Sequence, residues 1–545
     1  MSQTVVSTTH GDDDLSAVEP AVETAPARRP EATGQPRSGA VVALWLAALT
    51  VVSAALRLPG MGISMWIDEG LSVGIASHPW SEIPGLLVQD GSPPLYYLVL
   101  HGWMEVFGRS VEAVRALSLL LATATVPVAF WAGDRLFGRR AAWVAASLFA
   151  TSSYLTVYAR EARMYTLVLL LGLVCTTACV RALVYGHRRS LPVFVVALTL
   201  LLYTHNWGLF LGVALAVVVV VAKRLGAALE WRDAVVAFGA VALLYAPWLP
   251  TLAVQAAHTG APWSASPDLG DLVGAFPTLL GDRAVGLLLV VIAGPALLAG
   301  RRVHSPGGLV VTVLAILAVA TVVVAWLASQ LSPAWATRYF SLVLAPLLLL
   351  AAAGLARDGR RGMLALGLIM LLWVDPGGRL GLFHRPSIPR KSNVGPAAAR
   401  IADRLQPGDV VVSTHMEQVP LLHYYLGPDL RYADPMGPVA DPGIVDWRDA
   451  LSRVEAASTD EGLVPLIDDL DTGGHVVLAC ARLSPTSDRA RLRLPWFEAS
   501  ARNCAEWRSA LDDQLSMELV EGPVAPPPRN AAGSSMFLLV YQKQG

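Results

Sequence analysis

The sequence predicts a polytopic α-helical membrane protein with a small α/β domain at its C-terminal end. Of the 545 residues, 54% are hydrophobic and only 15% are charged, whereas soluble proteins carry about 25% charged residues. The charges are missing from long apolar runs and return beyond about residue 376. The formal net charge of −1 argues against electrostatic binding of nucleic acid.

The N-terminal segment 1–38 is rich in Ala, Pro, Thr, Glu and Asp and has no apolar periodicity. This composition is typical of a disordered tail. A cleaved secretory signal would place its apolar stretch much nearer to Met1. We therefore interpret the apolar run that begins near Val41 as an uncleaved first membrane span.

Apolar runs long enough to cross a membrane follow one another through most of the chain. A spanning helix needs roughly 20 apolar residues, and about eleven candidates approach this length. They occupy residues 40–59, 116–134, 141–157, 164–186, 191–204, 207–222, 233–250, 284–300, 308–328, 340–356 and 362–374. The polar sequence Thr204-His205-Asn206 interrupts one of these stretches, which predicts two short helices that meet at a polar point.

The basic residues of the short loops predict the orientation, because Lys and Arg accumulate on the cytoplasmic side. The clusters are Arg135, Arg139 and Arg140; Arg188 and Arg189; Lys223, Arg224 and Arg232; Arg301 and Arg302; and Arg357, Arg360 and Arg361. Each follows an even-numbered span, so all share one side with the N-terminal tail. We expect a cytoplasmic tail (1–38), a transmembrane domain (39–375) and an external C-terminal domain (376–545).

The C-terminal domain has the pattern of a small α/β fold. Short apolar segments predict strands at 409–413, 475–481 and 536–542 and a helix at 396–405. Cys480 and Cys504 lie in this domain and can pair in an oxidising compartment. Cys175 and Cys179 lie in an apolar run, where a free Cys usually acts as a small hydrophobe.

The first external loop, 60–115, opens with MWIDEG, so that Asp68 and Glu69 follow the first span directly. Adjacent carboxylates point in different directions, so one can act on a reacting hydroxyl while the other contacts a cation or a helix N-terminus. Alternatively, the pair is solvated or caps a helix.

Two amphipathic segments, HPWSEIPGLLVQDG and SPPLYYLVLHGWMEVFG, are too short to span the membrane and predict interfacial helices. These helices either roof a site reached from the lipid or serve as simple anchors.

The external turn YAREARMY places Arg160, Glu161 and Arg163 between Tyr158 and Tyr165. Guanidinium groups bind phosphate in a bidentate manner, and ionisable residues at membrane depth usually face a cavity or each other. The alternative interpretation is an internal Arg–Glu ion pair that locks two helices together.

Two further external segments carry candidate residues. His205 lies in YTHNWG, at the break between two short helices, and Arg338 and Tyr339 lie in ATRYF. A lone His is usually structural, and Arg338 can extend its charge to the interface. However, the cytoplasmic preference of basic residues does not explain an Arg at this external position.

The order of WIDEG, SPPLYYLVLHGW, LFGRR, YAREARMYTL, LYTHNWGLFL, YAPWLP and TRYF resembles the GT-C superfamily of membrane glycosyltransferases. The similarity covers about residues 40–350. It is greatest to the glycosyltransferase family 39-like branch, which contains bacterial lipid A aminoarabinose transferases and protein O-mannosyltransferases. The resemblance implies a GT-C-like fold with interfacial helices in the first external loop. It also implies a polyprenyl-phosphate sugar as the donor.

The resemblance further implies an inverting sugar transfer to an envelope acceptor at the external membrane face. The acceptor class stays open between a glycolipid, a polysaccharide and a protein. Asp68 matches the position of the catalytic base, and Glu69 matches the second acidic position. Related sequences have His where this chain has Ser92, which leaves the acceptor or metal environment near Asp90 open. No cofactor is assigned with certainty, and a divalent metal remains an alternative.

The predicted site residues fall into three groups. The catalytic pair is Asp68 and Glu69. The donor phosphate ligands are Arg160, Arg163 and Arg338. The substrate cavity is expected to contain Asp90, Tyr96, Tyr97, Tyr158, Glu161, Tyr165, His205 and Tyr339.

Two other functions compete with a glycosyltransferase. A transporter or flippase of lipid-linked sugars would have functional polar residues deep in its spans and pseudo-repeated halves. Here the polar residues gather at the outer surface, and the sequence shows no such repeat. A non-catalytic membrane scaffold for cell-envelope assembly would not require Asp68.

Overall fold

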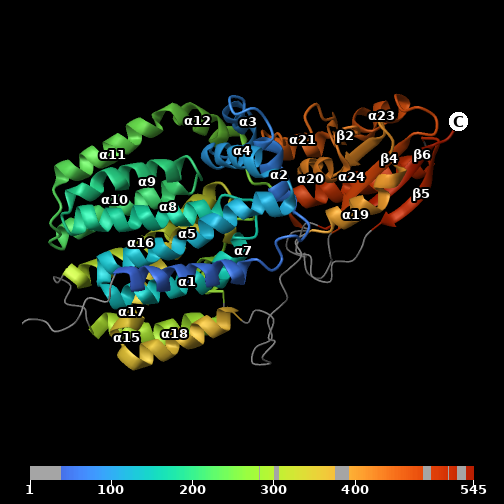
Figure 1. The fold of residues 1–545 in the computed structure, drawn as a ribbon. Helices are drawn as coiled ribbons and strands as arrows, with labels where there is room; N and C mark the ends of the chain where they lie inside the picture. The colour runs from blue at the N-terminus through green and yellow to red at the C-terminus, as the bar shows by residue number, and fades with distance from the viewer. Residues whose placement is uncertain are drawn as a thin grey trace, which may run out of the picture. The chain divides into compact units, whose positions relative to one another are not determined.

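The computed structural model consists of a helical part followed by a domain built around a sheet (Figure 1). It describes residues 39–281, 283–299, 306–374, 392–482, 493–513, 515–524 and 535–545, so the predicted disordered tail 1–38 lies outside the described residues. Trp45–Gly545 form one compact unit, separate from Met1–Leu44.

The helical part extends to residue 374. Its elements are α1 (Gly39–Arg57), α2 (Ile67–Ala76), α3 (Ile83–Asp90), α4 (Leu95–Phe107), α5 (Val111–Phe137), α6 (Arg139–Thr151), α7 (Ser153–Tyr158), α8 (Tyr165–Cys179), η1 (Val180–Val184), η2 (Arg188–Ser190), α9 (Leu191–Leu202), α10 (Gly208–Arg224), α11 (Trp231–Tyr245), η3 (Ala246–Trp248), α12 (Leu249–His258), α13 (Leu269–Leu279), α14 (Arg283–Leu288), η4 (Leu289–Ala293), α15 (Gly294–Ala299), α16 (Pro306–Leu331), η5 (Thr337–Phe340), α17 (Ser341–Arg357) and α18 (Gly359–Val374). Among them, α5 packs against α6 and α8, and α17 packs against α16, α6 and α8.

Six helices of the described chain are long and apolar enough to cross a membrane. They are Gly39–Arg57, Val111–Phe137, Tyr165–Val184, Trp231–His258, Gly307–Leu331 and Thr337–Arg357. The bent pair Leu269–Leu279 and Arg283–Leu298 would make a seventh span if it is counted as one. The break predicted between two short helices is present, because α9 ends at Leu202 and α10 begins at Gly208.

Several boundaries differ from the expected ones, and two of the differences have a clear local cause. The predicted span 233–250 continues to His258, so much of the expected loop 251–283 is helical in α12 and α13. Pro250 permits this continuation because it lies in the first turn of α12, where a missing N–H costs little. The predicted span 116–134 begins earlier, at Val111. There the hydroxyl of Ser110 accepts a hydrogen bond from the backbone N–H of Ala113 and caps the helix.

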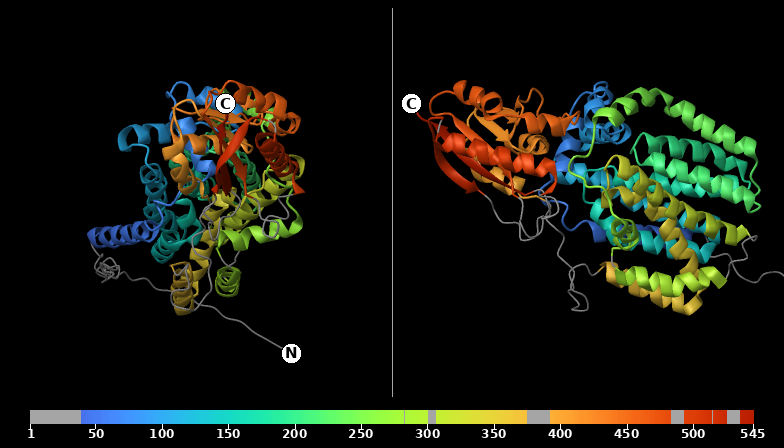
Figure 2. Two further views of the ribbon diagram at one scale, coloured as in Figure 1. Left: turned by 90° about the vertical axis from the view of Figure 1, so that its right-hand side faces the viewer. Right: turned by 180° about the vertical axis from the view of Figure 1, so that it is seen from behind.

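The C-terminal domain contains the predicted strands, and its sheet has helices on both faces. Its elements are α19 (Val394–Ile401), η6 (Ala402–Arg404), β1 (Val410–Ser413), η7 (Met416–Gln418), α20 (Val419–Leu426), β2 (Arg431–Asp434), β3 (Gly437–Pro438), α21 (Ala450–Ala456), α22 (Thr459–Gly462), α23 (Val464–Asp468), β4 (His475–Ala481), α24 (Pro495–Asp513), β5 (Met517–Val524) and β6 (Met536–Lys543). The sheet order is β3-β2-β1-β4-β6-β5 (Figure 2). Strand β1 is parallel to β2 and β4, whereas β6 is antiparallel to β4 and β5.

The two faces of the sheet belong to different cores. Val410 and Val412 of β1 pack with Trp507 of α24. Val411, which points to the other face, belongs to the same buried cluster as Leu422 of α20 and the core of the helical part. The predicted pairing of Cys480 with Cys504 is confirmed, and this disulfide joins β4 to α24.

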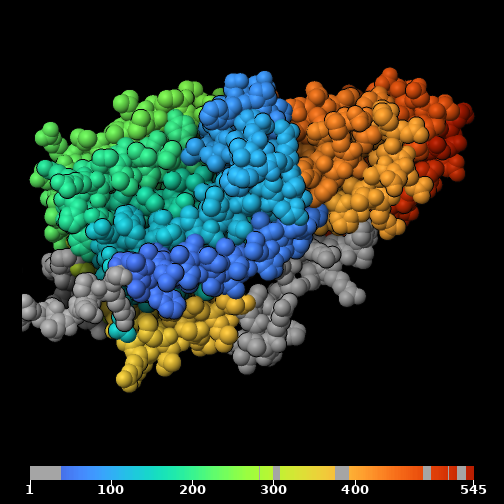
Figure 3. All heavy atoms as spheres, in the orientation of Figure 1, coloured from blue at the N-terminus to red at the C-terminus, as the bar shows by residue number. Residues whose placement is uncertain are grey.

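Close backbone approach joins the C-terminal domain to α2. A Cβ atom at Gly70 would lie 2.9 Å from Cβ of Leu421, and one at Gly74 would collide with the carbonyl oxygen of Gly443. Because these glycines are one helical turn apart, they form one small-residue face of α2. Figure 3 shows the segment that contains α2 to α4, in blue, directly beside the orange C-terminal domain. The helix that carries Asp68 in its first turn is therefore positioned in part by the C-terminal domain.

Candidate functional site

Asp68 lies in the first turn of α2, immediately after the connection from α1. Its carboxylate is mostly buried and is approached by two guanidinium groups. Nε of Arg338 lies 3.3 Å from Oδ2 of Asp68, and Nε of Arg163 lies 3.9 Å from the same oxygen. The three residues come from segments far apart in the sequence, so the fold assembles the cluster that the external motifs predicted.

Further contacts hold the two arginines in place. Nη1 of Arg163 donates to the backbone oxygen of Asp68 at 3.2 Å and to Oγ of Ser72 at 2.9 Å. The guanidinium of Arg338 lies over the ring of Trp263, with 4.6 Å between its Cζ and the ring centroid, and also over Trp66. Such stacking orients a guanidinium while leaving its N–H groups free to bind an anion.

Glu69 points away from Asp68 and forms a buried ion pair. Its carboxylate accepts hydrogen bonds from Nε and Nη2 of Arg115 at 2.7 and 2.6 Å. It also accepts from the backbone N–H groups of Ala162 and Trp66. Glu69 is fully buried, so the structure does not support a catalytic role. It joins α2, α5 and the turn that carries Arg163.

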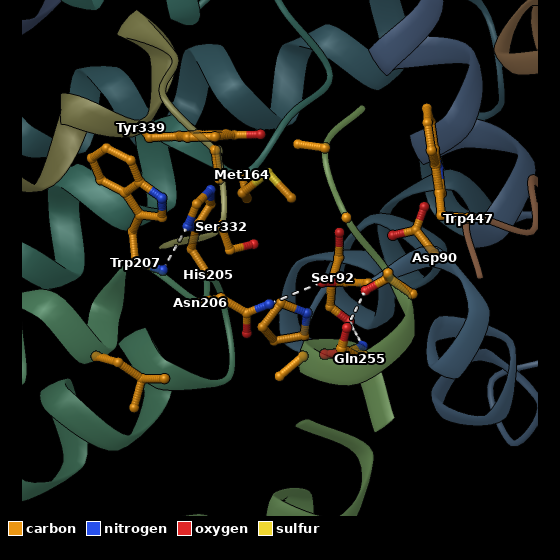
Figure 4. Close-up of a pocket in the computed structure, with 18 of the residues that line it drawn as sticks. Asp90, Ser92, Met164, His205, Asn206, Trp207, Gln255, Ser332, Tyr339 and Trp447 are labelled. Atoms are coloured by element: carbon orange, nitrogen blue, oxygen red, sulfur yellow. Dashed lines mark hydrogen bonds between the residues drawn. The ribbon is translucent and has the colours of Figure 1, made fainter. Parts of the chain in front are cut away.

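A cavity of about 360 Å³ lies beside the Asp68 cluster. Its wall includes Asp68, Arg163 and Arg338, while Leu209, Phe210 and Leu252 contribute apolar surface from α10 and α12. In Figure 4, His205, Trp207 and Tyr339 gather on one side of this cavity, and Asp90 and Trp447 lie on the opposite side. The cavity thus combines charged groups with an apolar wall, as small-molecule sites commonly do.

His205 lies in the wall of the cavity, as its position between α9 and α10 suggested. Burial, followed by the positive charges of Arg163 and Arg338, lowers the pKa of His205 to about 3. Its Nδ1 accepts a hydrogen bond from the backbone N–H of Trp207 at 3.1 Å. The neutral ring therefore carries its proton on Nε2.

Asp90 ends α3 and also lines the cavity. The hydroxyl of Tyr97 donates to Oδ2 of Asp90 at 3.4 Å, and burial raises the pKa of Asp90 above its usual range. The next turn of the chain is fixed by side-chain amides. Asn206 donates to the backbone oxygen of Gly91 and Gln255 to that of Ser92, at 2.9 and 3.2 Å (Figure 4).

The predicted aromatic residues are divided between the cavity wall and the surrounding core. Tyr339 lines the cavity. Tyr96 and Tyr97 are fully buried in the core beneath it. Tyr165 is also buried, with its ring centroid 5.8 Å from Cζ of Arg163. Its ring therefore packs against the guanidinium of Arg163, a predicted phosphate ligand.

Arg160 and Glu161 also lie outside the cavity wall formed by the described residues. Arg160 donates from Nε to the backbone oxygen of Arg57 at 3.0 Å and from Nη2 to that of Leu56 at 3.1 Å. It caps the end of α1, so the expected phosphate contact of Arg160 is not supported. Glu161 is buried and lies near Arg115, and it is not part of the cavity wall either.

A second cavity, of about 490 Å³, lies on the other side of Arg338. Its wall includes Trp66, Tyr158 and Trp335, and it shares Trp263 and Arg338 with the first cavity. Arg338 therefore stands in the partition between the two cavities. Tyr158 is thus a cavity residue, although of this second space.

The C-terminal domain adds one cavity residue, Trp447, and one buried acid close to the Asp68 cluster, Glu417, that the sequence analysis did not select. Glu417, in η7 of the C-terminal domain, is buried, and its Oε2 has no hydrogen-bond partner in the described chain. Burial, followed by the charge of Asp68, raises the pKa of Glu417 to about 8, against the opposing effect of Arg338. Trp447 lines the first cavity from the same domain. No local sequence signal identified either residue, because both reach the site by docking of a remote domain.

The residues of the cavity do not fit a divalent metal. In the described part of the chain, no group of three or more His, Cys, Asp or Glu side chains is placed to hold a metal ion. The two carboxylates of the cavity differ in surroundings, and Asp68 is flanked by two guanidinium groups. These cations would repel a divalent cation at Asp68.

Solved structures with the same fold are found by structural comparison. No family model and no curated protein matches the sequence. ArnT from Cupriavidus metallidurans bound to undecaprenyl phosphate matches with a TM-score of 0.59 and 16% sequence identity, over 92% of this chain and 98% of ArnT. The apo state of the same protein matches with a TM-score of 0.54 and 15% identity, over the same shares of the two chains. The chain therefore shares the fold of ArnT, as the resemblance of its motifs predicted.

Proposed function

We propose that this protein is a membrane glycosyltransferase that uses a polyprenyl-phosphate-linked sugar and acts on an envelope acceptor at the external membrane face. The observation that carries the proposal is the cluster of Asp68, Arg163 and Arg338 in the wall of a partly apolar cavity. The structural similarity to ArnT bound to undecaprenyl phosphate supports the class of donor.

The charge of the cluster suits a lipid phosphate. One carboxylate and two guanidinium groups leave one net positive charge beside a cavity whose other surfaces include aliphatic side chains. Guanidinium groups bind phosphate oxygens through paired N–H donors. They also stabilise the negative charge that develops on a leaving phosphate. The apolar wall offers a path for the polyprenyl chain toward the lipid.

The reaction that we propose is a single displacement at the anomeric carbon. Asp68 accepts the proton of the acceptor hydroxyl, whose oxygen forms a bond to the anomeric carbon of the sugar. The bond between that carbon and the phosphate oxygen breaks, and its electron pair leaves with the polyprenyl phosphate. Arg163 and Arg338 neutralise the phosphate, and the configuration of the sugar inverts. Neutral His205 contributes a hydrogen-bond donor rather than a charge.

Arg163→Lys and Arg338→Lys should each weaken binding of undecaprenyl phosphate by about tenfold or more, because each loses a charge-assisted hydrogen bond while keeping the charge. Arg160→Lys is the matched control, since Arg160 binds backbone carbonyls of α1. Binding to purified protein in nanodiscs measures the effect. Unchanged affinity in both variants would remove the two arginines from the phosphate site.

The orientation that we propose places the N-terminal tail (1–38) in the cytoplasm and the C-terminal domain (376–545) outside, on either side of the transmembrane domain (39–375). The basic loop clusters support it. So does the Cys480–Cys504 disulfide, since such bonds persist in oxidising compartments.

Reporter fusions test this topology directly. A fusion after Gly362 should report the cytoplasmic side, and a fusion after Pro376 should report the external side, because most of α18 lies between them. A periplasm-active phosphatase and a cytoplasm-active fluorescent protein at each position give complementary signals. A cytoplasmic signal from the second fusion would contradict the orientation.

A further inference from the structure

The segment 441–449 of the C-terminal domain is hydrogen-bonded to the ends of three helices next to the first cavity. The backbone N–H of Trp447 donates to the backbone oxygen of Gln89 at 2.9 Å. The backbone N–H of Asp449 donates to the backbone oxygen of His258 at the same distance. On the N-terminal side of this segment, Nε2 of His78 lies 2.7 Å from Oδ2 of Asp441. These contacts tie the segment to the ends of α2, α3 and α12.

These hydrogen bonds place Trp447 beside Asp90. Because Trp447 bonds to Gln89, the residue that precedes Asp90, the two side chains enter the cavity wall together. Figure 4 shows them adjacent, on the side opposite to His205 and Tyr339. The ring of Trp447 packs against the ring of Trp496, with 5.6 Å between their centroids, and this contact restricts the orientation of Trp447.

The wall of the cavity contains both cationic and acidic groups. Arg163 and Arg338 lie beside Asp68, and Asp90 lines the same cavity with Trp447 as its aromatic neighbour. A sugar phosphate has the complementary pattern, with an anionic phosphate at one end and neutral hydroxyl groups at the other. Asp90 would repel a phosphate but can bond hydroxyl groups in either protonation state.

The indole ring of Trp447 favours a sugar over other ligands that carry hydroxyl groups. A sugar ring presents C–H groups on its face, which pack on an indole ring, and hydroxyl groups at its edge, which bond to a carboxyl group. A polyprenyl tail offers no hydrogen-bonding group to the Asp90 carboxyl, which in the structure accepts a hydrogen bond from the hydroxyl of Tyr97. The cavity volume of about 360 Å³ is within the usual range for small-molecule sites.

We infer that Trp447 and Asp90 form the subsite for the sugar of the lipid-phosphate donor, so that the C-terminal domain takes part in selecting the sugar. This inference rests on the proposed function, because it needs the phosphate to lie at Arg163 and Arg338. It gives the C-terminal domain a direct role in donor recognition, and it makes Asp90 and Trp447 specificity-determining residues.

The test compares lipids with and without a sugar on the full-length protein in nanodiscs. The probes are undecaprenyl phosphate and undecaprenyl phosphate that carries mannose, glucose or arabinose. In the wild type, at least one sugar-bearing lipid should bind about tenfold more tightly than undecaprenyl phosphate, as hydrogen bonds to a carboxyl group allow. Trp447→Ala and Asp90→Asn should each remove most of this difference without weakening the binding of undecaprenyl phosphate.

Two further variants separate recognition from folding. Trp447→Phe keeps an aromatic ring in the buried cluster and should retain part of the preference, even if Trp447→Ala fails to fold. Trp80→Ala, at a side chain that is 63% exposed in the same external region, should change nothing. A parallel loss of affinity for lipids with and without sugar would show a merely structural role and overturn the inference. So would an unchanged preference in Trp447→Ala and Asp90→Asn, or a wild type that binds no sugar-bearing lipid more tightly. Failure of the wild type to bind undecaprenyl phosphate at all would instead contradict the proposed function itself.

Discussion

Asp68→Asn should lower sugar transfer at least about 100-fold, because general-base catalysis contributes roughly 100- to 10,000-fold. The substitution keeps the size of the side chain and removes the proton acceptor. Arg163 should stay in place, since its Nη1 binds the backbone oxygen of Asp68 and the hydroxyl of Ser72. Loss of the carboxylate frees both guanidinium groups from a competing anion. Binding of undecaprenyl phosphate should therefore be as tight as in the wild type, or tighter.

This combination of lost transfer and retained lipid binding separates the candidate functions. Transfer to an envelope extract and lipid affinity would be measured on the same purified protein, with thermal stability as a check on folding. Asp134→Asn is a suitable control, because Asp134 is a partly exposed acid paired with Arg139 at the far end of α5. Wild-type transfer by Asp68→Asn would remove Asp68 from the mechanism and favour a transporter or a scaffold.

Glu69→Gln should destabilise the fold by about 3–5 kcal/mol, the typical effect of breaking a buried ion pair from one side. Arg115 would remain buried with its charge uncompensated, although its hydrogen bond to the backbone oxygen of Met61 would persist. Thermal unfolding of the purified protein and its yield in membranes measure the loss. Glu82→Gln, at an exposed position between α2 and α3, should leave both unchanged.

A double variant identifies the cause of that loss. In Glu69→Gln with Arg115→Gln, no buried charge is left alone, so the double variant should be more stable than Glu69→Gln. A double variant that is no more stable would mean that the shape of the side chains, rather than the unpaired charge, governs stability here.

Much of the fold could be predicted because its signals are local. Apolar length predicted the six helices that are long enough to cross a membrane, although the expected count of about eleven spans is not confirmed. The polar break at Thr204–Asn206 predicted the separation of α9 from α10, and short apolar runs predicted β1, β4 and β6. The convergence of Asp68, Arg163 and Arg338 could also be predicted, because alternate connections between spans meet on one side of a membrane.

The remaining features depend on tertiary contacts that a single sequence does not reveal. Arg160 and Arg163 belong to the same turn and the same residue type, yet one caps α1 and the other faces Asp68. Glu69 and Asp68 are neighbours, but Glu69 pairs with Arg115, whereas Asp68 faces Arg163 and Arg338. Arg115 had a detectable signal, since a lone Arg at the start of an apolar helix needs a partner. Trp447 had none, because its place is fixed by the docking of the C-terminal domain on α2.

An experimental structure of the protein in nanodiscs with undecaprenyl phosphate is the most direct test of the central claim. We predict density for the phosphate between Arg163 and Arg338 in the first cavity, with the polyprenyl chain along the apolar wall formed by α10 and α12. Asp68 should then lie beside the phosphate, on the side from which an acceptor hydroxyl can approach. Density for the phosphate elsewhere, with Arg163 and Arg338 still paired to Asp68 alone, would contradict the account.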